Sequence, residues 1–135
     1  MVITNQIENI NNHTLIKEGS YEIIEIHCSS DFIYEAKHIK EIHKILQEIS
    51  KAKNKKLLIL ILFKEYTTVT LETLIYISKG QHKRFIEAEA FKIQSPSQRF
   101  MLRYLINCLS TQVKAKYFAK KGEAEEWLNL FVKDL

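Results

Sequence analysis

Short runs of hydrophobic residues along the chain predict the strands of a β-sheet. Residues 14–18 and 21–27 are two β-like runs on either side of Gly19-Ser20, a combination that is typical of a β-hairpin. The run "LLILILF" at 57–63 contains no polar residue, which predicts a central strand buried on both faces. Further strands are expected at 86–93 and 113–119.

Segments with helical periodicity separate these strands. From residue 32 to residue 49 hydrophobic residues recur at steps of three and four, after Ser30 or Asp31 as N-cap, and predict a long amphipathic helix. Thr70 is the expected N-cap of a second helix that ends at Gly80. Two more helices are expected at 96–109 and 122–133.

The resulting order, β-β-α-β-α-β-α-β-α, predicts the fold class. Three successive strand-helix-strand units require parallel pairing with right-handed crossovers, so we expect an α/β fold. Its five-stranded mixed sheet would combine an N-terminal antiparallel hairpin with parallel strands, and four helices would cover it. A chain of 135 residues with three glycines, one proline and no internal repeat fits a single domain over 1–135, with its core in 13–133.

Alternation along the last two predicted strands indicates what each face of the sheet carries. We expect one face to hold Ala88, Ala90, Ala115 and Tyr117, and the opposite face to hold Glu87, Glu89, Lys114 and Lys116. Towards the carboxyl ends of the strands the polar face is expected to become an apolar patch of Phe63, Phe91, Ile93 and Phe118. The chain itself is the favoured cover for this patch, ahead of a second copy or a bound acyl chain.

Charge adds a second surface. The net charge of +4 is modest, and no aromatic residues alternate with the lysines, so we expect no nucleic-acid partner. Basic residues follow three of the predicted helices and should gather at the N-terminal edge of the parallel strands; they include Lys53, Lys55, Lys83, Arg84, Lys114 and Lys116. The favoured interpretation is stabilisation of helix C-termini, and the alternative is an anionic partner such as an acidic protein or a phospholipid headgroup.

The N-terminus lacks the basic start and the apolar run of a signal peptide, and residues 57–63 are too few to span a bilayer. We therefore expect a cytoplasmic protein without a transmembrane segment. Cys28 and Cys108 show no paired spacing, which predicts free buried thiols rather than a disulfide framework or a zinc site.

Catalytic and metal-binding patterns are not found. Glycine-rich phosphate loops and the G-x-S-x-G motif are missing from the sequence. His38 and His43 lie five residues apart on one predicted helix, about 140° around its axis, so we expect two solvent-facing histidines and no shared metal. We expect no enzyme, no cofactor and no metal. Only a buried pair such as Cys108 beside a histidine would favour an enzyme.

At the level of motifs, the chain resembles the SpoIIAA-like branch of the STAS domains over residues 13–133. In that branch a strand ending in A-x-A leads to a Ser-x-x-x-Arg helix start, and a late Phe precedes an E-A-x-x-W-L helix. The matching residues here are Ala88, Ala90, Ser95, Arg99, Phe118, Glu123, Ala124, Trp127 and Leu128. Members of this branch, which is common in Bacteroidetes, are largely of unknown function.

The wider STAS family implies two functions. One is a phospho-switched interaction domain, as in anti-sigma-factor antagonists, and the other is lipid binding, as in the related CRAL-TRIO fold. The antagonists carry Asp-Ser-Ser-Gly between the third strand and the second helix, where this chain has "FKEYTTVTLE" with Thr67, Thr68 and Thr70. The resemblance thus implies a non-enzymatic regulatory module with a protein partner, and a homodimer. The alternative it implies is a lipid or small apolar ligand near Phe63, Phe91 and Phe118.

The stretch "SPSQRF" at 95–100 is the second candidate site. Ser95 as N-cap, Pro96 at the first helical position and Gln98 three residues after the cap form the pattern of a capping box. Arg99 is not explained by helix capping, since a first-turn arginine opposes the helix dipole. Because functional loops of α/β sheets lie at the carboxyl ends of strands, the three threonines, Ser95 and Arg99 are the candidate switch or interaction residues.

Overall fold

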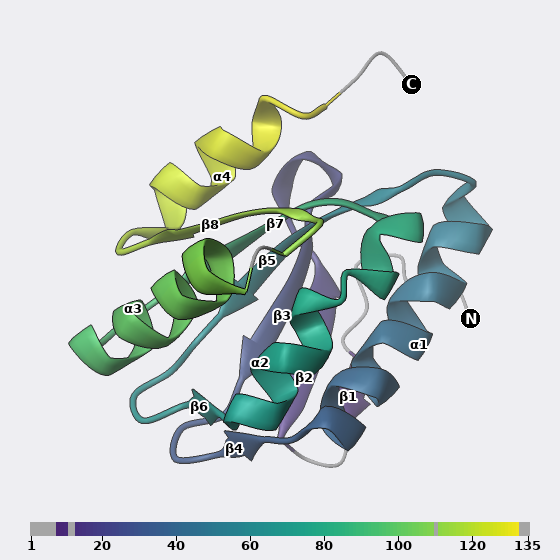
Figure 1. The fold of residues 1–135 in the computed structure, drawn as a ribbon. Helices are drawn as coiled ribbons and strands as arrows, with labels where there is room; N and C mark the ends of the chain where they lie inside the picture. Colours follow the sequence, from purple (N-terminus) through teal and green to yellow (C-terminus); the bar gives the residue numbers. More distant parts are fainter. Residues whose placement is uncertain (1–7, 11–12, 110, 133–135) are drawn as a thin grey trace.

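A computed structural model describes residues 8–10, 13–109 and 111–132 of the chain. One mixed sheet has the strand order β1-β2-β3-β5-β7-β8, antiparallel for the first two pairs and parallel for the other three (Figure 1). This confirms the α/β class, and the short edge strand β1 joins the five strands that were predicted. The strands are β1 (Glu8–Ile10), β2 (Thr14–Glu18), β3 (Ile24–Cys28), β5 (Leu57–Leu62), β7 (Ile86–Lys92) and β8 (Lys114–Phe118).

The predicted hairpin is present, with a longer connection than expected. Strands β2 and β3 pair with Thr14 opposite Cys28 and Glu18 opposite Ile24. Between them lies a short 3-10 turn, Ser20–Glu22, in which Tyr21 has φ 56°. Because these residues turn, the second strand begins at Ile24 rather than at residue 21.

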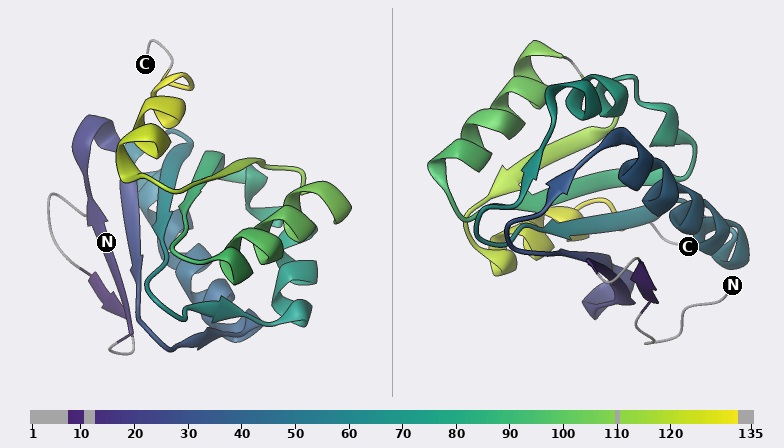
Figure 2. Two further views of the ribbon diagram at one scale, coloured as in Figure 1. Left: turned by 90° about the vertical axis from the view of Figure 1, so that its left-hand side faces the viewer. Right: turned by 90° about the horizontal axis from the view of Figure 1, so that it is seen from below.

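The helices form unequal layers on the two faces of the sheet (Figures 1 and 2). Three helices cover one face: α1 (Ala36–Lys53), α2 (Leu71–Ser78) and α3 (Pro96–Arg103), the last continuing as a π-helical turn at Tyr104–Cys108. Among the described residues, α4 (Lys121–Asn129) is the one helix on the other face, where Ala124 and Leu128 pack on Leu60, Ala88 and Ala90. A 3-10 turn, η2 (Gln81–Arg84), connects α2 to β7.

The first helix begins later than predicted. Its N-cap is Glu35, not Ser30 or Asp31, and residues Ile33–Tyr34 form a short strand, β4. This strand pairs in parallel with β6 (Thr68–Val69) in a separate two-stranded sheet. The backbone before Glu35 therefore bonds to a segment that is distant in sequence instead of closing a helical turn.

The predicted composition of the two sheet faces is wrong by one residue between β7 and β8. Glu89 lies opposite Ala115, and Ala90 lies opposite Lys116, so these pairs share a face. As a result Ala88 and Ala90 lie on the α4 side together with the lysines of β8. Glu89 lies on the other side, where it is buried. Alternation sets the two faces of each strand, but the register between two strands is a non-local property.

Within the described part of the chain, no helix is long and apolar enough to cross a membrane.

Candidate functional site

Gln98, near the start of α3, joins two loops at the carboxyl edge of the sheet. Its Nε2 atom donates to the carbonyl oxygens of Lys64, at 2.8 Å, and Thr67, at 3.0 Å, both in the loop after β5. Its Oε1 atom accepts a hydrogen bond of 2.7 Å from the backbone N–H of Gln94, in the loop after β7. The two groups of candidate residues predicted from the sequence are therefore neighbours.

Thr67 extends this connection to a third loop. Its hydroxyl accepts from the Lys64 N–H at 3.0 Å and donates to the Ser29 carbonyl at 2.8 Å, and the residue is 0% exposed. In the same region the Asp31 N–H donates to the Glu65 carbonyl at 3.1 Å. Thr67 therefore has a structural role, and in this conformation a kinase has no access to it.

The other two threonines differ in accessibility. Thr70 is the N-cap of α2, as predicted: its hydroxyl accepts from the Thr73 N–H at 3.2 Å and lies 2.6 Å from the Thr73 hydroxyl. Thr68 lies in β6, and its side chain is exposed. Of the three candidates, Thr68 is thus the one that offers a hydroxyl to solvent.

Ser95 is the N-cap of α3, with Pro96 at the first helical position, as predicted. Its hydroxyl accepts from the Gln98 N–H at 3.3 Å, but the Gln98 side chain bonds to Gln94 rather than back to Ser95, so the capping box is incomplete. Arg99 is exposed, lines an open hollow with Lys92 and Ser95, and forms no ion pair with any residue in the described ranges.

Large apolar side chains are exposed beside these loops. We name four of them the apolar rim: Ile33 in β4, Tyr66 in the β5–β6 loop, and Leu71 and Ile75 one turn apart on α2. The β4–β6 pairing places Ile33 directly opposite Thr68. Tyr66 is 65% exposed and has φ 63°, a left-handed conformation that is uncommon for a residue other than glycine. Thr68, the most exposed of the three candidate threonines, therefore lies among exposed hydrophobic residues.

The predicted apolar patch does not exist as one surface. Phe63, Phe91 and Ile93 are buried on the α1–α3 side of the sheet, where the two phenylalanine rings are 6.0 Å apart. Phe118 lies on the opposite side and packs on Trp127 of α4, with ring centroids 5.8 Å apart. The β7–β8 register, which places Tyr117 and not Phe118 opposite Phe91, is the reason.

An apolar cavity of about 60 Å³ lies between the sheet and helices α1 and α2. Aliphatic side chains line most of it, with Cys28 and Tyr34 among the polar groups. Burial raises the pKa of the Cys28 thiol to about 12, so it stays protonated and unreactive. A cavity that holds benzene measures about 150 Å³, so this one is too small for an acyl chain.

The six predicted basic-edge residues have local partners. Three form ion pairs: Lys53 with Glu18 at 2.8 Å, Lys55 with Glu22 at 2.7 Å, and Lys114 with Glu87 at 3.5 Å. Three contact neutral groups: Lys83 the Gln112 side chain, Arg84 the Gln81 carbonyl, and Lys116 the ring of Phe118. These contacts favour local stabilisation over a shared surface for an acidic protein.

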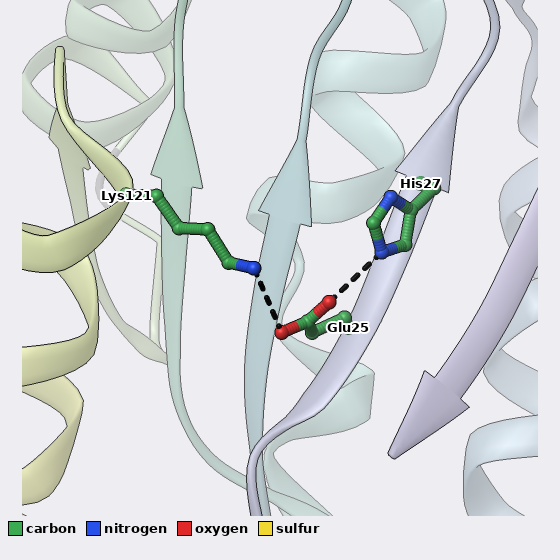
Figure 3. Close-up of polar contacts among 3 residues, drawn as sticks. All are labelled: Glu25, His27 and Lys121. Carbon is green, nitrogen blue, oxygen red and sulfur yellow. Dashed lines mark hydrogen bonds and ion pairs between the residues drawn. The ribbon is translucent and has the colours of Figure 1, made fainter. Parts of the chain in front are cut away.

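Sequence reasoning missed a buried carboxylate at Glu25 (Figure 3). Its Oε1 atom lies 2.9 Å from Nε2 of His27, and its Oε2 atom lies 3.3 Å from Nζ of Lys121. Burial alone would raise the pKa of Glu25, but the hydrogen bonds from His27 and Lys121 outweigh it and lower this pKa. The alternation Glu25-x-His27 placed two of these side chains on one face, whereas Lys121 joins them only through the fold.

A second histidine-carboxylate pair lies on the other face. His82 and Glu89 are both buried, with Nε2 and Oε1 3.2 Å apart, and the ring of His43 stacks on His82 at 4.6 Å. Burial and the neighbouring His82 lower the pKa of His43 to about 3, so its ring is neutral. The prediction of solvent-facing histidines is wrong, because His43 is half-buried here and His38 is half-buried at the start of α1.

The comparisons with known proteins agree with this architecture. A crystal structure of an uncharacterised protein of the DUF3478 family from Shewanella loihica PV-4, with a SpoIIAA-like fold, superposes with a TM-score of 0.59 at 17% identity. The alignment covers 93% of this chain and 97% of that one, which confirms the SpoIIAA-like fold. No protein with a curated description matches the chain. Residues 16–132 match the model of a domain of unknown function, DUF7793, and the chain belongs to that family.

Proposed function

We propose that this protein is a non-enzymatic interaction module that binds a protein partner through the apolar rim of Ile33, Tyr66, Leu71 and Ile75. The observation that carries the proposal is the exposure of these four side chains around one edge of the sheet. Contiguous apolar residues on a protein surface mark interaction sites, and tyrosine is frequent among residues that dominate binding energy.

The loops beneath the rim support this function because hydrogen bonds hold them in place before any partner binds. Gln98 and Thr67 hold three loops together through buried hydrogen bonds. A surface that is ordered before binding loses less conformational entropy when a partner binds. The left-handed backbone at Tyr66 is a further sign of a loop held in a specific shape.

Thr68 supplies a regulatory element to the proposed surface. A phosphate on its exposed hydroxyl would add a charge of about −1.5 to −2 beside Ile33. Because a charged group in an apolar interface must be desolvated, phosphorylation would oppose binding. The resemblance to the anti-sigma-factor antagonists also implies a phospho-switch, here with threonine in place of serine.

Affinity capture from the native organism, quantified by mass spectrometry, tests the interaction. The variant Tyr66→Ser/Leu71→Glu should lose the captured partner, and Thr68→Glu should weaken its capture, while Phe100→Glu should retain it as a matched control with one exposed aromatic changed on α3. Equal recovery with all variants would contradict the proposal. Sedimentation of the same variants tests the expected homodimer, since a second copy is one partner that the rim could bind.

Binding of a lipid or small apolar ligand is the second candidate, and the observation that favours it is the mainly aliphatic lining of the cavity of about 60 Å³ between the sheet and α1. At this volume a larger ligand requires α1 to move away from the sheet. Native mass spectrometry of the purified protein tests this function. A co-purifying apolar molecule that is lost in the cavity-filling variant Ile61→Phe would support it, and an unliganded protein with unchanged mass under the same conditions would contradict it.

A further inference from the structure

Two adjoining hollows form a groove between α1 and the η2 turn, at the edge of the sheet opposite the apolar rim. The first, of about 160 Å³, is lined among others by Lys40, Lys44 and Arg84. The second, of about 350 Å³, is lined among others by Lys51 and Lys56. The two hollows share Gln47, Arg84 and Phe85, so they lie side by side.

The wall contributed by α1 is one stripe of the helix. Its residues recur mostly at steps of three and four, which places them on one side of an α-helix, and they are Lys40, His43, Lys44, Gln47, Ser50, Lys51 and the C-cap residue Asn54. The stripe contains lysine, histidine, amide and hydroxyl side chains but no carboxylate. The acidic residues of this helix segment, Glu41 and Glu48, fall on a neighbouring stripe and line neither hollow.

The cations of the groove are available for a ligand. Within the described ranges Lys40, Lys44, Lys51, Lys56 and Arg84 form no ion pair. Lys40 lies 5.3 Å from the ring centre of Tyr76, which positions its ammonium at the first hollow. Only Nε of Arg84 is used, in a bond of 3.3 Å to the Gln81 carbonyl.

Two histidine rings, His43 and His82, line the first hollow. His82 is paired with Glu89, with Nε2 and Oε1 3.2 Å apart. The ring of His43 stacks between Tyr76 and His82 and has no hydrogen-bond partner among the described residues. A neutral imidazole offers one donor and one acceptor.

We propose that this groove binds a soluble phosphorylated small molecule, with its phosphoryl group in the hollow of Lys40, Lys44 and Arg84. A phosphoryl group carries about two negative charges and three acceptor oxygens, which fits three cations in one compact hollow better than a single carboxylate does. The second hollow, with Lys51 and Lys56, accommodates the rest of the ligand or a second anionic group.

A soluble ligand fits the groove better than a lipid headgroup. Residues that hold a headgroup at a membrane are flanked by exposed apolar side chains that enter the acyl region. None of the large hydrophobic residues found exposed in the described chain lines either hollow.

Titration of the full chain with pyrophosphate, followed by calorimetry and by amide chemical shifts, tests the proposal. Pyrophosphate should bind saturably and perturb amides of α1 and η2. The variant Lys44→Ala/Arg84→Ala should bind at least about tenfold more weakly. The control variant Lys114→Ala/Lys116→Ala loses the same charge elsewhere on this sheet edge and should bind like the unmodified protein.

Two outcomes would overturn the proposal. Equal weakening in both double variants would show general charge attraction rather than a site. Binding to vesicles with anionic phospholipids that is lost in the groove variant, together with no saturable binding of pyrophosphate, would assign the groove to a membrane surface. Circular dichroism and thermal unfolding of both variants ensure that the comparison concerns folded proteins.

Discussion

Replacement of Gln98 by methionine is the sharpest test of the loop arrangement at the carboxyl edge. Methionine has a similar volume and no amide, so the change removes the donors to Lys64 and Thr67 and the acceptor for Gln94 while it keeps the packing. Gln98 is buried, and each polar group left unpaired in a buried site costs about 1–3 kcal/mol.

Two carbonyls and one N–H lose their partner, and partial access of water to the loops reduces the penalty, so we expect a loss of about 3 kcal/mol in the free energy of unfolding. For a chain of this length that loss lowers the melting temperature by about 10 °C. Urea unfolding followed by the fluorescence of Trp127, the single tryptophan, measures it on the opposite face of the sheet.

Gln94→Ala is the matched control, because that side chain is exposed and its backbone N–H remains. Gln98→Glu retains the acceptor but removes the donors, and its buried carboxyl should have a raised pKa, so this variant should gain stability as pH falls. A loss below about 1 kcal/mol for Gln98→Met, equal to that of Gln94→Ala, would refute the reasoning that these hydrogen bonds hold the loops.

Three further predictions follow from buried groups. The pKa of His43 is lowered from 6.5 to about 3, so its contribution to stability should be complete above pH 6.5 and lost as pH falls towards 3. The variant His43→Phe should therefore reduce the dependence of the unfolding free energy on pH between these values. An unchanged pH dependence would contradict the argument from burial. A thiol reagent should modify exposed Cys108 at once and buried Cys28 only after unfolding, and rapid reaction of both thiols would show that the cavity opens. Ala90→Leu should lower the free energy of unfolding by about 1–3 kcal/mol, because the larger side chain would clash with Ala124 and Leu128 of α4. Lys116→Leu, at the paired position in β8, should lower it less. Equal losses would contradict the packing of α4 on Ala90.

The elements predicted from the sequence are those that local interactions determine. The caps at Thr70 and Ser95 and the buried strand 57–63 depend on residues close in the chain, and the structure confirms them. The start of α1 does not depend on nearby residues, because Ile33 and Tyr34 pair with a segment more than thirty residues away. Sequence periodicity continues through these residues, although their backbone is extended.

The candidate site, too, has features that the sequence predicts and features that depend on contacts between distant residues. The topology of an α/β sheet was enough to place the threonine loop and the Ser95 loop at one edge. The accessibility of each hydroxyl depends on Gln98 and Thr67 contacts across loops, which no spacing in the sequence reveals. The division of Phe91 and Phe118 between two cores depends on the register between β7 and β8. Lys121 of α4 reaches Glu25, and His82 of η2 reaches Glu89, only through the fold.

The position of α4 on the second face of the sheet has a consequence for synthesis. Synthesis runs from the N-terminus, so α4 is the last element of the described chain to leave the ribosome. The core beneath α1, α2 and α3 can close while Leu58, Leu60 and Leu62 still face water on the other side. Until the nine residues of α4 dock, the second face of the sheet leaves these leucines without their cover and prone to aggregation.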